Sequence, residues 1–143
     1  TVIAGTAEAV AKATEEFSKL KARVVPLKVA SAFHSKLMES ASKEFYETAK
    51  KIKFNKPQVK YYSNVTGAEL TDFSDMPSLL AKHIISPVRF VSELNAMQND
   101  GFTGFHEFGP NKVLTGLVKK TLKDVKAVNI ENLKTLEEVF CNE

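Results

Sequence analysis

Three histidines are the side chains of this sequence best suited to moving a proton. His34 follows an apolar stretch that ends near Ala30 and precedes a helical pattern that begins at Ser35. Reactive groups of open α/β sheets gather at the carboxyl ends of strands, so a histidine at this junction is a candidate general base. A helix-capping or packed histidine is the alternative. His83 and His106 fall inside a predicted helix and a predicted strand, where structural roles are favoured.

A nucleophile for such a base is not evident in the sequence. The G-x-S-x-G elbow that exposes a reactive serine does not occur in it. Ser31 and Ser35 are too close to His34 in sequence to face its ring, and Ser35 is predicted to cap the next helix. Cys141 has no histidine beside it. The histidines also lack a metal-ligand spacing such as H-x-x-x-H, so we expect no metal site.

Two features of the C-terminal third could bind anions. The turn at residues 109–112 leads into a helix whose first amides could hold a phosphate, although a tight turn that needs Gly and Pro is the favoured interpretation. The helix that follows carries Lys119, Lys120 and Lys123 on one side and apolar residues on the other. Such a cationic face is either merely solvated or receives an acidic protein.

The composition is that of a folded globular domain. The chain has 143 residues, with 20 Lys and Arg against 17 Asp and Glu, so its net charge is +3 with histidine neutral. This charge is too small and too dispersed to indicate a nucleic-acid partner. No run approaches the ~18 apolar residues that cross a bilayer, so we expect no membrane partner. The single cysteine excludes an intramolecular disulfide and fits a reducing compartment.

Strand patterns alternate with helix patterns along the chain. We predict strands at residues 1–5, 23–29, 59–65, 104–108 and 126–130. We predict helices at residues 6–20, 35–54, 75–85, 86–101, 111–122 and 132–140. Such alternation indicates an α/β fold with a mostly parallel sheet. Because the first residue is Thr and a strand pattern begins at once, we expect the sequence to be an excerpt of a longer protein.

Four segments together resemble one enzyme family. Residues 29–38 read VASAFHSKLM, residues 62–67 YSNVTG, residues 86–90 SPVRF and residues 105–114 FHEFGPNKVL. In this order and spacing they resemble the malonyl-CoA:acyl carrier protein transacylases and the related acyltransferase domains of fatty-acid and polyketide synthases. The opening residues, VIAG, are similar to a strand of that family's small ferredoxin-like sub-domain. The resemblance covers essentially the whole chain.

The resemblance implies a particular domain organisation. Residues 1–29 would be a remnant of the inserted ferredoxin-like sub-domain, and residues 30–143 the C-terminal part of an α/β-hydrolase-like large domain. The family's serine elbow, its malonyl-binding arginine and its oxyanion loop belong to the N-terminal half. We therefore expect this chain, as the C-terminal portion of an S-malonyltransferase, to be inactive alone. Asn111 stands where the family more commonly has Gly, and Asn tolerates the left-handed conformation of such a turn.

The resemblance also implies the mechanism and the partners. His34 would be the catalytic base that activates the serine, and the main-chain carbonyl of His83 would orient its ring. Phe33, in the sequence AFH, would favour malonyl over methylmalonyl groups by narrowing the pocket. We expect no cofactor, and as partners malonyl-CoA, acyl carrier protein and the missing N-terminal half. We expect the protein in the cytoplasm, or in the lumen of a plastid or mitochondrion.

Two alternatives stay open. The chain could be a non-catalytic module that binds acidic acyl carrier protein through the face of Lys119, Lys120 and Lys123. It could also be an acyltransferase domain of a multidomain fatty-acid or polyketide synthase.

Overall fold

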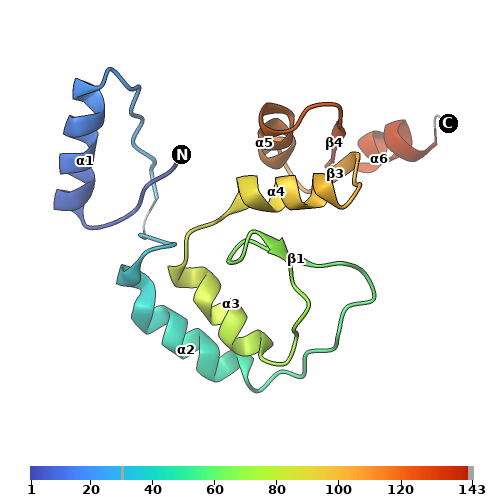
Figure 1. The fold of residues 1–143 in the computed structure, drawn as a ribbon, viewed down its shortest axis with the longest axis horizontal. Helices are drawn as coiled ribbons and strands as arrows, with labels where there is room; N and C mark the ends of the chain where they lie inside the picture. The colour runs from blue at the N-terminus through green and yellow to red at the C-terminus, as the bar shows by residue number, and fades with distance from the viewer. Residues whose placement is uncertain (30, 142–143) are drawn as a thin grey trace. The chain divides into compact units, whose positions relative to one another are not determined.

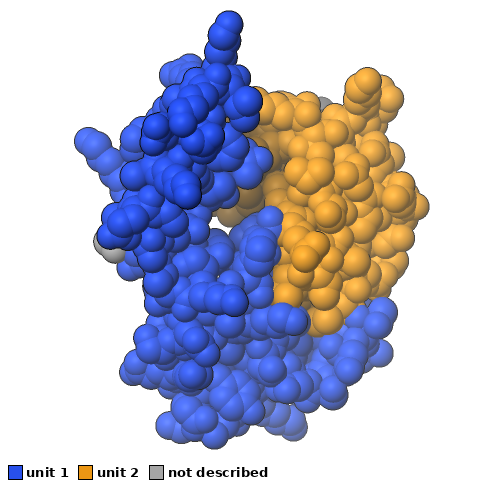
Figure 2. Space-filling model, turned by 60° about the vertical axis from the view of Figure 1, so that its left-hand side comes forward, with its two compact units in different colours: residues 1–59, 71–88 blue, residues 60–70, 89–143 orange. Residues whose placement is uncertain are grey.

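The computed structural model describes residues 1–29 and 31–141. Ala30, where the predicted domain boundary falls, and residues 142–143 lie outside this part. The chain forms two compact units, one of residues 1–59 and 71–88 and the other of residues 60–70 and 89–143 (Figure 2). The boundary between residues 29 and 30 that the resemblance implies stays a prediction.

The first unit is helical in its described part. It contains α1 (Ala7–Lys19), the short 3-10 helix η1 (Lys36–Met38), α2 (Glu39–Ala49) and α3 (Met76–Ile85). Helices α2 and α3 lie side by side (Figure 1). At their contact the buried hydroxyl of Ser42 donates to the Ala81 carbonyl at 2.7 Å. Because both residues are small, the two helices approach closely enough for this hydrogen bond.

The second unit is built on a strand–helix–strand element. It contains β1 (Tyr62–Ser63), β2 (Ala68–Glu69), α4 (Phe90–Asn99), β3 (Gly104–Phe108), α5 (Val113–Thr121), β4 (Lys126–Ile130) and α6 (Leu133–Phe140). Strands β3 and β4 pair in parallel, with α5 as the crossover between them, and β1 pairs with β2 as an antiparallel hairpin. The core of this unit is apolar and consists of Leu94, Val118, Leu122 and Ala127, packed by Phe90, Met97, Phe105 and Val125.

Polar contacts attach the β1–β2 hairpin to α4. Lys60 forms ion pairs with Glu69 at 2.8 Å and Asp100 at 3.1 Å, and the Tyr62 hydroxyl donates to Asp100. The hydrogen bonds from Tyr62 and Lys60 lower the pKa of Asp100, and those to Glu69 and Asp100 raise the pKa of Lys60. The hairpin is therefore held at the C-terminal end of α4.

The structure confirms the α/β class and corrects the expected sheet. Within residues 1–29 and 31–141 there are two sheets of two strands each, and only the β3–β4 pair is parallel. The strands predicted at residues 1–5 and 23–29 are wrong. These segments form no ladder, since none of the described segments lies beside them as a hydrogen-bonded strand, and their apolar side chains stay exposed, Val2 at 75% and Val29 at 70%.

Several predicted boundaries also shift. The helix expected from Ser35 begins as η1 and ends at Ala49, and the strand expected at residues 59–65 is reduced to β1. The helix expected from Ser86 begins only at Phe90, because Ser86 has extended dihedral angles and ends α3 instead. None of the helices in the described part is both long and apolar enough to cross a bilayer.

Candidate active site

His34 lies in a tight bend between segment 23–29, which is neither helix nor strand, and η1. Its φ of 64° is left-handed, which is uncommon for a residue with a Cβ atom. The next residue, Ser35, accepts a hydrogen bond from the Leu37 amide at 3.3 Å and donates one to the Ala32 carbonyl at 2.7 Å. The predicted cap at Ser35 is thus confirmed, and its hydroxyl is engaged in holding the bend.

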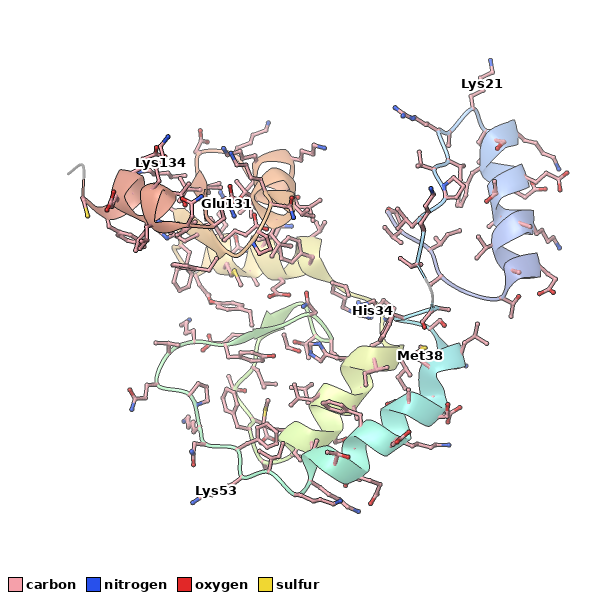
Figure 3. All side chains as sticks on the ribbon, turned by 180° about the vertical axis from the view of Figure 1, so that it is seen from behind. Lys21, His34, Met38, Lys53, Glu131 and Lys134 are labelled. Carbon is pink, nitrogen blue, oxygen red and sulfur yellow. The ribbon has the colours of Figure 1, made fainter. Side chains whose placement is uncertain are left out.

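The main chain of His34 is anchored to the end of α3. Its amide donates to the Ile84 carbonyl at 2.9 Å. The last carbonyls of an α-helix have no partner within the helix and carry a partial negative charge. His34 supplies a donor to this group of carbonyls, and Figure 3 shows its labelled side chain at that end of α3.

The imidazole of His34 meets two more carbonyls of the same region. Its Nδ1 lies 3.0 Å from the His83 oxygen and 3.0 Å from the Ser86 oxygen. A carbonyl oxygen can only accept a hydrogen bond, so the proton of the neutral ring belongs on Nδ1. Nε2 then carries the lone pair. His34 is exposed, so this nitrogen is free to take a proton from a group brought to it.

His83 contributes its main chain to this arrangement, and its ring is half-buried in α3. Burial, followed by the nearby charge of His34, lowers the pKa of the His83 imidazole below its usual 6.5. Near neutral pH the ring of His83 is therefore uncharged. The two histidines therefore contribute different groups to the site. His34 contributes its unprotonated ring nitrogen Nε2, and His83 contributes its main-chain carbonyl.

Phe33 lies next to the candidate base. Its ring centroid is 6.5 Å from that of His34, the two planes are tilted by 53°, and its side chain is 54% exposed. An exposed aromatic ring at this distance can limit the size of a group that reaches the imidazole. Its expected role in selectivity stays a prediction.

The chain also matches known proteins. The profile of the acyl transferase domain family matches residues 1–137. The chain belongs to the acyl transferase domain family. The malonyl CoA-acyl carrier protein transacylase of Bacillus subtilis is 36% identical over 137 residues, which cover 95% of this chain and 43% of that protein. A polyunsaturated fatty acid synthase polypeptide of Thraustochytrium is 41% identical over 126 residues, which cover 87% of this chain and 4% of that protein.

Solved structures of acyl transferases share the fold. The malonyl CoA-acyl carrier protein transacylase of Clostridium perfringens superposes with a TM-score of 0.88 at 32% identity, covering 93% of this chain and 42% of that one. A malonyl-transacylase in complex with a type II polyketide acyl-carrier protein superposes with a TM-score of 0.90 at 26% identity, covering 97% and 45%. The chain spans less than half the length of the curated relatives it matches.

The candidate anion site at the start of α5 is occupied by carboxylates of the chain itself. At the start of α5, the Leu114 and Thr115 amides donate to Glu107 at 3.0 and 2.8 Å. The Asn111 amide donates to Glu131 at 3.2 Å. The turn at residues 109–112 is therefore a structural turn, as favoured. Asn111 has a φ of 71°, which confirms the left-handed conformation expected there.

The three lysines of the candidate docking face belong to the second unit. Lys119, Lys120 and Lys123 are all exposed, at the C-terminal end of α5 and just after it. Their role stays a prediction. The apolar side of α5 is only partly covered: Val118 is 4% exposed, whereas Leu114 is 46% and Leu117 42% exposed.

The structure adds two residues that sequence reasoning missed. A helix was predicted to begin at Ser86, yet Ser86 ends α3 and its carbonyl faces the imidazole of His34. Glu107 was noted only as part of a motif, yet it caps α5. The proline after Ser86 was the available signal for the first, because a residue before proline is extended. A cap from a distant strand leaves no local signal.

Proposed function

We propose that this chain supplies the general base of a malonyl transfer from malonyl-CoA to the phosphopantetheine thiol of acyl carrier protein. The observation that carries the proposal is the pair of carbonyls, of His83 and Ser86, on Nδ1 of His34. They leave Nε2 unprotonated on an exposed ring. Several acyl transferase relatives are malonyl CoA-acyl carrier protein transacylases, which supports the choice of substrate and acceptor.

The transfer has two half-reactions, and both use a serine hydroxyl. The elbow motif that would carry this serine does not occur in the 143 residues. His34 Nε2 takes the hydroxyl proton while the serine oxygen attacks the malonyl thioester, and the proton then goes to the departing coenzyme A thiolate. In the second half, Nε2 takes the proton of the phosphopantetheine thiol, whose sulfur attacks the serine ester. The same proton returns to the serine oxygen. No cofactor is needed.

The environment of Nδ1 suits both halves of this cycle. The imidazolium that forms transiently carries a positive charge at the C-terminal end of α3, where main-chain carbonyls favour cations. The carbonyls of His83 and Ser86 accept the Nδ1 proton in both charge states of the ring. The ring therefore need not reorient when it gains and loses its second proton.

Phe33 would set the preference for malonyl over methylmalonyl groups. A branching methyl would have to fit against its ring, which stands 6.5 Å from that of His34. One methyl group in a pocket is worth about 1–3 kcal/mol of discrimination, so the result is a preference.

The remaining parts of the enzyme would come from elsewhere in the protein. We place residues 1–29 in a ferredoxin-like sub-domain and residues 30–143 in an α/β-hydrolase-like large domain, with the serine, the malonyl-binding arginine and the oxyanion loop in an N-terminal half. The 143-residue chain alone is then inactive. We place the protein in the cytoplasm or in the lumen of a plastid or mitochondrion.

A labelling experiment tests the function. Malonyl-CoA is added to the 143-residue chain and to the protein made from the complete reading frame, and a malonyl ester is sought by intact mass. We expect an ester on the complete protein alone and a rate about 10²–10⁴-fold lower after His34→Ala. His106→Ala is the matched control, since that ring packs on Phe140 in the second unit. An ester on the 143-residue chain, or an unaffected His34→Ala rate, would overturn the proposal.

A second candidate function has its own observation. Lys119, Lys120 and Lys123 are exposed within five residues of the chain, and such a face suits an acidic acyl carrier protein. Binding by the 143-residue chain that is strong at low salt and lost at high salt would favour a non-catalytic docking module. The Thraustochytrium match supports the further possibility of a synthase domain.

A further inference from the structure

Ser86 is the residue at which the chain leaves α3. Its amide still donates to the Lys82 carbonyl at 3.0 Å, as in a helix. Its φ of −96° and ψ of 150° are extended, so its own carbonyl no longer points along the helix axis. That carbonyl oxygen lies 3.0 Å from Nδ1 of His34.

The residue after Ser86 accounts for this change of direction. Proline disfavours the helical conformation of the residue before it and keeps that residue extended. With any other residue at position 87, Ser86 would be free to add to α3, and its carbonyl would turn parallel to those of the preceding turn. Pro87 itself is exposed, so it contributes little to the packing of the first unit.

We propose that Pro87 is a positioning residue for His34, because it keeps Ser86 extended and thereby holds a second carbonyl acceptor on Nδ1. With two acceptors on one nitrogen, the ring loses both hydrogen bonds if it flips or moves its proton to Nε2. With the His83 carbonyl alone, the ring can pivot. The catalytic meaning of this role rests on the proposed function, while the effect on the ring does not.

The position of the proton is measurable in the 143-residue chain. Long-range ¹H–¹⁵N spectra distinguish a protonated from an unprotonated ring nitrogen, at a pH where the signals show a neutral ring. We expect Nδ1–H in the wild-type chain. In Pro87→Ala the ratio of Nδ1–H to Nε2–H should fall about fivefold, which corresponds to about 1 kcal/mol for one hydrogen bond.

Two control variants separate the carbonyl from other effects. Pro110→Ala makes the same chemical change at an exposed position of the second unit. Ser86→Ala removes the hydroxyl but keeps the carbonyl and the following proline. We expect both to retain the wild-type ratio, and a fall in either equal to that of Pro87→Ala would overturn the proposal.

Three further outcomes would contradict the proposed role of Pro87. Nε2–H in the wild-type chain, or an unchanged ratio in Pro87→Ala, would contradict the proposal. Pro87→Ser serves as a second variant if Pro87→Ala does not fold by its amide spectrum. Unfolding of both would overturn the proposal, since Pro87 would then support the fold rather than the ring.

Activity of the complete protein separates this inference from the proposed function. If malonyl transfer occurs, we expect Pro87→Ala to lower kcat with KM unchanged, and an unchanged kcat despite a shifted tautomer would deny the catalytic meaning. If the wild type transfers no malonyl group, the proposed function fails. The tautomer measurement then still decides whether Pro87 positions the ring.

Discussion

Glu107 in β3 and Thr115 in α5 lie within hydrogen-bond distance of each other across eight residues of chain. The Thr115 amide donates to the Glu107 carboxylate at 2.8 Å and its hydroxyl at 2.7 Å. The residue at the N-cap of α5, Lys112, makes no side-chain cap. A carboxylate from the neighbouring strand thus satisfies the free amides at the start of the helix, where negative charge is favoured.

We expect Glu107→Gln to destabilise the second unit in a pH-dependent way. The hydrogen bonds from the Thr115 hydroxyl, then those from the amides, lower the pKa of Glu107 below its usual 4.5. The stabilisation is therefore complete above about pH 4.5 and is lost as the pH falls through the lowered value. Urea midpoints of both proteins, measured from neutral pH to about pH 3, should converge at the acid end. The exposed Glu137→Gln should show no such convergence.

Glu93 in α4 should behave in the opposite sense. It is 6% exposed, its Oε2 atom has no hydrogen-bond partner among the described residues, and burial raises its pKa above the usual 4.5. A raised pKa means that this carboxyl favours the folded state when protonated, so its contribution is lost as the pH rises above 4.5. We expect Glu93→Gln to be more stable than the wild type at neutral pH and equal near pH 4, measured by urea unfolding. Lower stability at neutral pH would contradict this.

Replacement by alanine should change the free energy of unfolding in opposite directions at Gly67 and Gly116. Gly67 has a φ of 70°, and an added Cβ would lie 2.7 Å from the Ser92 Cβ and 3.0 Å from the Arg89 Cβ. We expect Gly67→Ala to cost about 1–3 kcal/mol of unfolding free energy. Gly116 lies within α5, and apart from its chain neighbours and the backbone of its own helix no atom of the described residues lies within 4 Å of such a Cβ, so Gly116→Ala should gain about 0.5–1 kcal/mol. Chemical unfolding measures the free energy of unfolding of both variants, and a change in the same direction for both would contradict this prediction.

The core of the second unit can be tested on a single helix. Leu94 is 2% exposed and packs in the cluster with Val118 and Ala127, whereas Val91 on the same helix is 59% exposed. We expect Leu94→Ala to lower the free energy of unfolding by about 2–5 kcal/mol. Val91→Ala should change it by no more than about 0.5 kcal/mol. A large loss for Val91→Ala would mean that this face of α4 is covered in solution.

The ring of His83 makes the first unit sensitive to mild acid. Burial and then the charge of His34 lower its pKa below 6.5, so the unfolded chain binds a proton more readily than the folded one. The stability of the wild type should therefore fall as the pH drops below about 6.5. His83→Gln keeps the main-chain carbonyl and removes the imidazole whose protonation lowers the stability. We expect thermal unfolding of the two proteins to coincide at mildly alkaline pH and the variant to be the more stable in mild acid.

Local signals predicted the helices and the β3–α5–β4 element. Apolar periodicity and side-chain caps, such as the one predicted at Ser35, are properties of a few consecutive residues, and the structure contains that cap. The predicted strands at residues 1–5 and 23–29 failed for the opposite reason. A strand needs a neighbour to bond with, and apolar composition alone does not provide one.

The candidate site shows the same division. The position of His34 after a predicted strand and before a predicted helix was enough to suggest a base. That its proton is held by carbonyls of residues 83 and 86 depends on where α3 ends in space, some fifty residues later in the chain. Side-chain types at those positions carry no local signal of the contact. The family resemblance implied the role of the His83 carbonyl, and the proline at 87 signals the change of backbone direction at Ser86.

The ring of His34 is held by main-chain carbonyls, so alanine substitutions in this region would not reveal the groups that orient it. Replacing His83 or Ser86 deletes a side chain and leaves the oxygen in place. A survey of single substitutions would therefore detect only the imidazole of His34. The contribution of the two carbonyls would be detected only by changes to the backbone, such as replacement of the proline or of a peptide amide by an ester.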